Sequence, residues 1–275
     1  YLNDYINKDP YCEVAWHQLG RQNFIIENYI EAIRAFDYAI LIDEFFVGAY
    51  LEKAKSLEKI NEFEEAIENY KATLKLDDPT AFVFLRIGQC YENLGNISLA
   101  INNYKNAVHE DPLLEKGWLA ITKLYMQDNQ YNNALFYINK AIEIDGGNSV
   151  YWRKNAEINL KLNFFEEVEK AFQKCILLED NDIVIWAGLS DVLCYLGEYT
   201  DALDALHKAK HYFNNVAEVE FRLGCVYFEL KDIQKGVFHL KKALNIDFEY
   251  HLIIAKLFPN VFKKEIVKDI LNDFK

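Results

Sequence analysis

The sequence predicts an all-α protein made of stacked helix–turn–helix hairpins, followed by a capping helix at the C-terminal end. Three observations lead to this fold class. Apolar residues recur at spacings of three and four, as they do on a helix that buries one face. The same pattern returns every 34 residues without an insertion, and an amphipathic segment follows its last copy. Because one hairpin cannot bury its apolar face alone, neighbouring hairpins must stack.

Residues 81–114 carry the clearest copy of the pattern. Two periodic segments, 81–94 and 97–110, are separated by Gly95-Asn96, and Asp111-Pro112 ends the second one. Glycine and asparagine tolerate the left-handed conformation that ends a helix, and Asn61 and Asn129 stand at the corresponding turns of neighbouring copies. This stretch is therefore predicted to form two helices joined by a short turn.

When the copies are aligned at intervals of 34 residues, equivalent positions form columns. Some of these columns hold small side chains and others hold large ones. The columns through Gly88, Ala100 and Ala107 hold Gly, Ala, Ser, Thr or Cys at 20 of 21 positions, and Val168 is the exception. The column through Tyr104 holds large residues only. This alternation fits pairs of helices that approach closely. It predicts seven repeats, at 13–46, 47–80, 81–114, 115–148, 149–182, 183–216 and 217–250.

The two ends of the chain complete the predicted array. Residues 1–12 match the second half of a truncated repeat, which is expected to expose an apolar face made of Tyr1, Leu2, Tyr5 and Ile6. Since the chain starts without Met, we expect that an earlier segment has been removed, which leaves open a lost signal peptide or a missing domain.

Residues 251–275 are predicted to cap the last repeat. A short helix stops at Pro259, and an amphipathic capping helix follows it. The apolar face of that helix holds Phe262, Ile266, Ile270 and Phe274, with Val267 and Leu271 beside them. A helix lying on a membrane surface is the less favoured alternative, because the polar face mixes both signs of charge.

Three repeats depart from the pattern. Lys53 and Asn155 stand in a column that is otherwise apolar, and Asn159 replaces a large residue nearby. We interpret the two asparagines as locally weaker packing in the fifth repeat, with a functional site as the alternative. Glu220 begins the seventh repeat where all earlier repeats have an aromatic side chain.

Composition limits the class of function. The net charge is −13 and the pI is about 5.0, so the field of the whole chain repels nucleic acids and anionic membranes. No apolar run is long enough to cross a bilayer, and no secretory signal opens the chain. The five cysteines lack metal or disulfide spacing, which favours free thiols in a reducing compartment. We expect a cytoplasmic protein without a nucleic-acid partner and without membrane insertion.

The sequence contains no recognisable catalytic motif. His207 and His211 stand four residues apart, but zinc needs three or four convergent ligands, so a solvent-facing pair is favoured over a metal site. Gly146-Gly147 lacks the lysine of a phosphate loop, and no G-x-S-x-G motif occurs. Glutamate clusters are better explained as solvated helix faces. We predict no catalytic residue, no metal ligand and no cofactor.

The repeats resemble the tetratricopeptide repeat family, whose pattern is W-x2-L-G-x2-Y followed by A, F, A and P. The matching residues are Trp16, Leu19, Gly20, Ala32, Phe36 and Ala39 in the first repeat, and Gly88, Tyr91, Ala100, Tyr104, Ala107 and Pro112 in the third. The resemblance covers about nine-tenths of the chain and implies a right-handed α-solenoid whose first helices line a concave groove. Because the matching residues are packing residues, they indicate the fold strongly and the partner weakly.

The resemblance also implies which positions face the groove, namely the second, fifth, sixth, ninth, twelfth and thirteenth of each repeat. The basic residues there are Arg21, Lys55, Lys59, Arg86, Lys116, Lys123, Arg153, Lys154, Lys161 and Arg222. The acidic ones are Glu52, Glu58, Glu92, Glu157, Asp191, Glu218 and Glu229. The apolar ones include Phe24, Leu51, Phe82, Leu85, Leu119, Phe221 and Phe228. The implied groove is therefore net positive, with the third to fifth repeats at its centre.

These observations predict a non-catalytic scaffold that binds a peptide or protein segment, with an acidic partner favoured by the basic groove. The predicted contact residues are Arg86, Lys116, Lys123, Arg153, Lys154, Phe82 and Leu119. A clamp for the C-terminal carboxylate of chaperones is disfavoured, because its asparagine is missing from every ninth position.

Two alternatives remain open. In the first, the array is a self-assembly or spacer region of a larger protein, with self-association through the exposed N-terminal half-repeat. In the second, it is an RNA-binding helical repeat, which the net charge disfavours.

Overall fold

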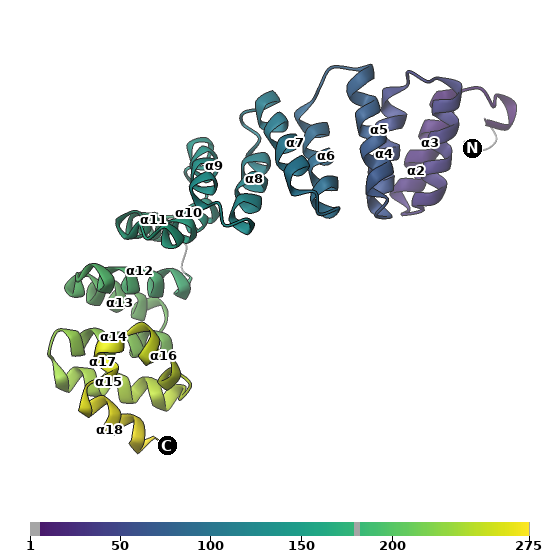
Figure 1. Cartoon of the computed structure of the whole chain (residues 1–275). Coiled ribbons are helices and arrows are strands. Elements are labelled where there is room, and N and C mark those ends of the chain that lie inside the picture. The colour runs from purple at the N-terminus through teal and green to yellow at the C-terminus, as the bar shows by residue number, and fades with distance from the viewer. Residues whose placement is uncertain (1–5, 179–181, 275) are drawn as a thin grey trace. The chain divides into compact units, whose positions relative to one another are not determined.

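The computed structural model describes residues 6–178 and 182–274, where all regular secondary structure is helical (Figure 1). The predicted all-α fold class, a solenoid repeat of stacked helix pairs, is confirmed. The expected apolar face at Tyr1, Leu2 and Tyr5 lies outside the described residues. Ile6 belongs to the described part and is buried, so the prediction that this side chain is exposed is wrong.

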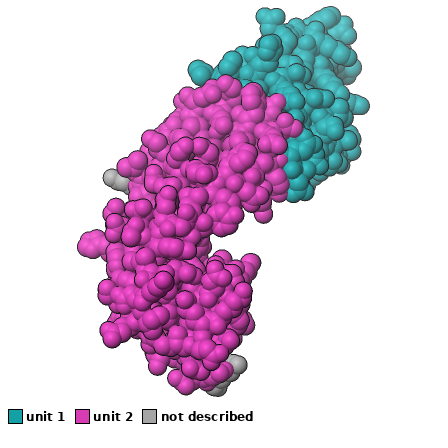
Figure 2. Space-filling model, turned by 60° about the vertical axis from the view of Figure 1, so that its left-hand side comes forward, with its two compact units in different colours: residues 1–130 teal, residues 131–275 magenta. Residues whose placement is uncertain are grey.

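Residues 1–130 form the first of two compact units (Figure 2). Three helix pairs and one further helix follow each other: α2 (Glu13–Ile25) with α3 (Tyr29–Ile42), α4 (Val47–Lys59) with α5 (Phe63–Leu76), α6 (Ala81–Asn93) with α7 (Ile97–Glu110), and α8 (Glu115–Gln127). The helices of a pair pack against each other, and each second helix packs on the first helix of the next pair.

Residues 131–275 form the second unit, which opens with α9 (Tyr131–Ile144). Three pairs and a terminal segment follow: α10 (Ser149–Leu162) with α11 (Phe165–Leu177), α12 (Ile183–Leu196) with α13 (Tyr199–Tyr212), α14 (Ala217–Glu229) with α15 (Ile233–Ile246), then α16 (Tyr250–Leu257), α17 (Pro259–Phe262) and α18 (Glu265–Asp273). The boundary between the units separates α8 from α9, the two helices of the fourth predicted repeat.

Within the helix pairs, small residues of one helix contact large residues of the other. A Cβ atom on Gly88 would lie 2.6 Å from the Tyr104 ring, and one on Gly20 would lie 2.5 Å from the Phe36 ring. Both rings are fully buried. The glycines therefore set how closely the two helices of a pair approach, which is the role that the column pattern indicates.

The turns inside the pairs use left-handed residues where the sequence predicts them. Asn61, Gly95 and Asn129 have φ angles of 63°, 75° and 56°. Asparagine and glycine pay little for this conformation. Glu27 and Lys231 occupy the same turn of the first and last pairs with φ angles of 61° and 63°, without that advantage.

Tryptophans of the aromatic column hold the start of three first helices. The indole N–H groups of Trp16, Trp118 and Trp152 each donate a hydrogen bond of 2.9 Å to the carbonyl oxygen six residues earlier. Glu220 stands in the same column at the start of α14, and its side chain is only 1% exposed.

The Glu220 carboxylate is surrounded by three basic side chains. Lys210 of α13 approaches it to 2.9 Å, Lys242 of α15 to 2.8 Å and His239 of α15 to 2.6 Å. Burial raises the pKa of Glu220, but the hydrogen bonds from these three groups outweigh burial and lower the pKa to about 2. An ion cluster thus replaces the aromatic side chain at this joint.

The other polar departures also find partners. Lys53 forms ion pairs with Asp37 at 2.8 Å and Glu65 at 3.1 Å. Asn159 donates to Asn155, which donates to Asn139, each at 2.8 Å. The side-chain amide oxygen of Asn159 has no hydrogen-bond partner among the described residues, so this ladder is incomplete.

The terminal segment differs from the single amphipathic helix that the sequence predicts. It consists of the short helix α17 and the separate helix α18, which buries Val267, Ile270 and Leu271. Ile266, assigned to the apolar face, is 38% exposed. The assignment of Ile266 is therefore wrong, whereas the other five residues of the predicted face are buried or pack against the core cluster at this end.

The terminal segment covers two residues that the sequence analysis assigned to the groove. Phe221 and Phe228 of α14 are fully buried in a cluster with Ile254, Phe258 and Val261 of α16 and α17. Their assignment as exposed anchors is wrong, because the chain itself continues over this side of α14. No helix of the described residues is long and apolar enough to span a membrane.

Candidate protein-binding surfaces

The first helices of the pairs carry the predicted contact residues. We call their exposed side the first-helix surface and describe it separately for each unit. In residues 1–130 it holds Phe82, Arg86, Lys116, Leu119 and Lys123, and in residues 131–275 it holds Arg153 and Lys154.

Arg86 is held by an acid of the preceding pair. Its Nε atom donates to Glu58 Oε1 at 3.0 Å, a second nitrogen also contacts Glu58, and Nη1 donates to Gln89 at 2.9 Å. Only 28% of the arginine side chain is exposed. Its charge is therefore neutralised within the chain before any ligand arrives.

The other predicted bases show the same behaviour with one exception. Lys123 pairs with Glu92 at 2.6 Å, Arg153 with Asp182 at 2.6 Å, and Lys154 with Glu157 at 2.7 Å. Lys116 is exposed and makes no ion pair or hydrogen bond with the described residues. The predicted basic residues are therefore present, but most of them already form ion pairs with acidic residues of the chain.

The two predicted apolar anchors differ in exposure. Phe82 is 45% exposed, and the Lys55 ammonium lies 5.3 Å from the centre of its ring. Leu119 is half-buried. A cavity of about 400 Å³ in the same unit is mainly polar and includes Glu58, Arg86, Gln89 and Glu92 in its lining, but neither Phe82 nor Leu119. In residues 1–130 this surface is thus a network of internal polar contacts.

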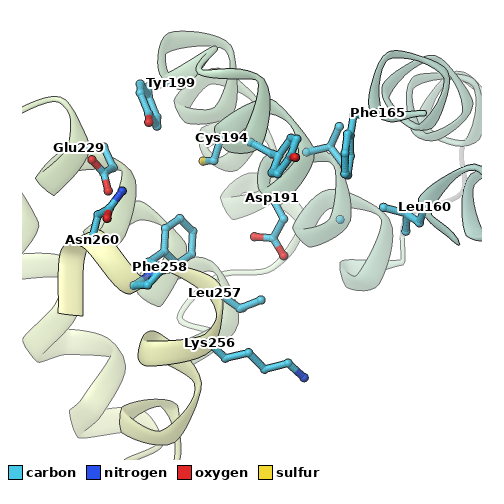
Figure 3. A pocket seen from close by; sticks show the side chains of 14 residues that line it. Leu160, Phe165, Asp191, Cys194, Tyr199, Glu229, Lys256, Leu257, Phe258 and Asn260 are labelled. Carbon is cyan, nitrogen blue, oxygen red and sulfur yellow. The ribbon is translucent and has the colours of Figure 1, made fainter. Parts of the chain in front are cut away.

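A larger cavity, of about 520 Å³, lies on the first-helix surface of residues 131–275 (Figure 3). We call it the α12 pocket, because five of its lining residues belong to α12. Its lining comprises Leu160, Phe165, Gly188, Asp191, Val192, Cys194, Tyr195, Tyr199, Glu229, Lys256, Leu257, Phe258, Pro259 and Asn260.

Aromatic and aliphatic groups make up much of this wall. The rings of Phe165 and Tyr195 lie close together, with centroids 3.9 Å apart, and Tyr195 is 70% exposed. Leu160 and Leu257 are 39% and 38% exposed. Apolar walls with a few polar groups are typical of ligand pockets.

A polar network lies behind the pocket. Arg222 donates to both oxygens of Asp191, at 2.9 and 2.8 Å, and also pairs with Glu218, which accepts a hydrogen bond from Tyr250. Burial raises the pKa of the Asp191 carboxyl, and the neighbouring Arg222 guanidinium opposes that shift. The network fixes α12, α14 and α16 around the pocket.

The thiol in the pocket is held in its protonated form. Burial, followed by the charge of Asp191, raises the pKa of Cys194 to about 12. Burial also raises the pKa of Tyr199, with Glu229 as the next cause. These shifts leave a neutral thiol and a neutral phenol in the wall, so neither side chain is activated as a nucleophile.

The sequence analysis placed Asp191 and Glu229 on this surface but missed the pocket. Its apolar part could have been suspected from Tyr195, which stands where the corresponding residues of neighbouring repeats are Lys161 and Gln127. The part of the lining formed by residues 256–260 could not have been predicted, because no repeat pattern covers this segment. Among the described residues, no three His, Cys, Asp or Glu side chains form a metal-binding group.

The tetratricopeptide repeat model matches residues 47–79, 83–112, 116–148 and 217–250. Helix pairs in this register, with the small and large columns in contact, define a helical repeat protein. The chain is a tetratricopeptide repeat protein, and proteins with these repeats are generally scaffolds for protein–protein interaction and typically non-catalytic.

Solved structures support the same fold. The C-terminal part of a repeat protein from Cytophaga hutchinsonii is 15% identical, with a TM-score of 0.68 over 93% of this chain and 99% of that one. YrrB, described as a repeat protein with an unusual peptide-binding site, is 14% identical, with a TM-score of 0.56 over 67% and 94%. MamA is 19% identical, with a TM-score of 0.56 over 61% and 92%. No curated protein sequence matches the chain.

Proposed function

We propose that this protein is a scaffold that binds a segment of a partner protein in the α12 pocket. One observation carries the proposal: a cavity of about 520 Å³ with exposed apolar side chains lies on the first-helix surface of residues 131–275. The description of YrrB as a peptide-binding repeat protein is consistent with this use of the fold. This proposal uses other contacts than Arg86, Lys116 and Lys123, whose role in binding stays a prediction from the sequence.

The test compares partner capture by the parent chain and by a Leu160→Glu/Leu257→Glu variant. Both leucines are partly exposed in the pocket, so the charges should block an apolar ligand without unfolding the chain. Leu230→Glu is a matched control, because Leu230 is also 38% exposed but does not line the pocket. Partners retained by the parent and the control and lost by the variant support the proposal. Equal capture by all three chains would overturn it.

Charge reversal at Arg86 and Arg153 is a poor test of the same function. It would place a new acid beside Glu58 and Asp182, so a loss of binding would be confused with damage to internal ion pairs. Lys116→Glu lacks this defect. Loss of a partner by Lys116→Glu alone would favour the acidic partner and the basic surface that the sequence predicts.

Self-association is the second candidate function, and the outer face of α3 favours it. Ile30, Tyr38 and Leu41 share this face and are 58%, 50% and 81% exposed. Most of the corresponding residues of other repeats are polar, among them Glu64, Lys75 and Lys140, and Ala72 and Leu177 are the exceptions. An exposed apolar stripe on one repeat is a candidate contact surface.

The stripe is complementary to a second copy of itself. If two α3 helices pair antiparallel around a two-fold axis between residues 35 and 36, Ile30 faces Leu41 of the other copy. Arg34 then faces Asp37; both side chains are at least half-exposed, and within the chain Arg34 pairs with Glu31 and Asp37 with Lys53. The helix therefore carries both an apolar and a charged match for itself.

The matching charges allow a sharp test by sedimentation velocity. Arg34→Asp places two like pairs at the two-fold contact, and so does Asp37→Arg, so each variant should be monomeric where the parent is a dimer. Mixing the two variants puts the new aspartate of one chain opposite the new arginine of the other. A heterodimer in the mixture supports pairing through α3, and a monomeric parent would overturn it.

A further inference from the structure

We infer that the α12 pocket binds a lysine or arginine side chain of the partner segment beside Glu229, together with an apolar side chain beside Leu160 and Phe165. The inference rests on the proposed function, because it specifies the ligand of the same pocket. It differs from the acidic partner that the sequence analysis favours.

The Glu229 carboxylate is the unmatched charge of the pocket. Glu229 is the last residue of α14, is half-buried, and makes no ion pair or hydrogen bond with another described side chain. Figure 3 shows that its side chain lies next to Asn260, close to Tyr199 and on the opposite side from Phe165 and Leu160. A partly desolvated carboxylate without a cation gains free energy when a cation arrives.

The neighbouring charges do not supply that cation. Arg222 is shared between Asp191 and Glu218 behind the wall. Lys256 lines the pocket, but its ammonium group points away from Glu229 (Figure 3). Three carboxylates therefore face two basic groups around the cavity, which leaves one negative charge in excess.

The aromatic lining suits the rest of a basic side chain. Cations bind over the faces of aromatic rings, and the methylene stem of lysine or arginine packs on apolar walls. Tyr199 and Phe258 lie on the Glu229 side of the cavity, and the close Phe165–Tyr195 ring pair offers an apolar seat on the other. An acidic side chain in the same place would bring two carboxylates together in a partly dry cavity, which is unfavourable.

The probe is a set of short peptides selected from a displayed random library on the immobilised full chain. Selection on the parent should enrich lysine or arginine beside a large apolar residue, and selection on Glu229→Gln should not enrich the basic residue. A selected peptide and its Lys→Gln counterpart are then compared by fluorescence polarisation. Glu229→Gln should weaken binding of the basic peptide about tenfold and leave the neutral peptide within about twofold.

Two controls separate this inference from the proposed function. Glu166→Gln removes an exposed acid of α11 outside the pocket and should leave both affinities unchanged. Leu160→Glu/Leu257→Glu should abolish binding of both peptides. Peptides that need the two leucines but carry no basic residue, or that bind Glu229→Gln equally well, would overturn the basic-side-chain inference and keep the proposed function. Selection of no peptide that depends on the two leucines would overturn both.

Discussion

Glu220 shows how a single residue can change the character of a joint between repeats. The equivalent position in other repeats holds Trp16, Trp118, Trp152 and Trp186. In this repeat the buried Glu220 carboxylate instead forms ion pairs with Lys210, His239 and Lys242. Buried ion clusters are sensitive to the loss of one member, because the remaining charges lose their compensation.

We therefore expect Glu220→Gln to lower the free energy of unfolding by about 2 kcal/mol at pH 7. The pKa of Glu220 is about 2 in the folded chain against 4.5 for an ordinary glutamate. A lowered pKa stabilises the fold above the ordinary value, and this stabilisation is lost as the pH falls from 4.5 towards 2. Denaturant unfolding across this range should show the parent approaching the variant. A difference that stays constant with pH would show that the carboxylate charge is not the cause.

A substitution at Gly88 tests how closely the two helices of a pair must approach. Gly88→Ala places a methyl group 2.6 Å from carbons of the buried Tyr104 ring, so we expect a loss of about 1 to 3 kcal/mol in unfolding free energy. Gly146→Ala is the matched control, since its methyl group would meet only a backbone oxygen at 3.4 Å. Equal stability of the parent and Gly88→Ala would mean that α6 and α7 can separate at no cost.

At the scale of elements, the terminal segment completes the second unit. α16 and α17 cover Phe221, Cys225 and Phe228 of α14, three side chains that a solenoid end would otherwise leave in water. The same segment supplies Leu257 and Asn260 to the α12 pocket. The cap and one wall of the candidate site are thus the same piece of chain.

Phe258→Ala should therefore cost about 3 to 5 kcal/mol, because it leaves a cavity between α14 and the cap. Phe258 is 6% exposed, whereas Leu252 in the same segment is 68% exposed and serves as the control. Urea unfolding of both variants measures the difference. A Phe258→Ala loss no larger than that of Leu252→Ala would contradict the capping role.

The helix pairs could be predicted because their signal is local and repeated. Gly88 and Tyr104 are 16 residues apart and recur in register, so spacing alone reveals the contact. The pairing of Arg86 with Glu58 depends on side-chain directions across two repeats, and the position rule that assigns both residues to one surface does not show that they neutralise each other.

The repeat pattern also does not show which of its surface positions are buried by another segment of the chain. Phe221 and Phe228 hold positions typical of the surface, but the terminal segment packs over both rings, and Phe228 also lies against Gly236 of α15. The α12 pocket escaped prediction for the same reason, since five of its lining residues lie in that segment.

At the scale of the whole molecule, the two compact units are each built from contacts between neighbours in sequence. In such arrays stability is nearly a sum of repeat and nearest-neighbour terms, so a part with intact ends can fold alone. The α12 pocket and the cap both belong to residues 131–275.

We expect residues 131–275, produced alone, to remain helical and to bind a peptide selected on the full chain within about threefold of its original affinity. Circular dichroism and fluorescence polarisation measure the two properties. A folded fragment that has lost the affinity would show that residues 1–130 take part in binding. An unfolded fragment would show that the second unit depends on the first.

The aromatic column has an optical consequence. All four tryptophans of the chain occupy it, and the last is Trp186, so the α14–α15 pair and the cap contain none. Tryptophan emission follows the earlier repeats, whereas far-ultraviolet ellipticity follows every helix. If the cap and the last helix pair unfold first, the far-ultraviolet ellipticity falls while the tryptophan emission stays constant. The difference between the two unfolding curves then measures this partial unfolding without an added label.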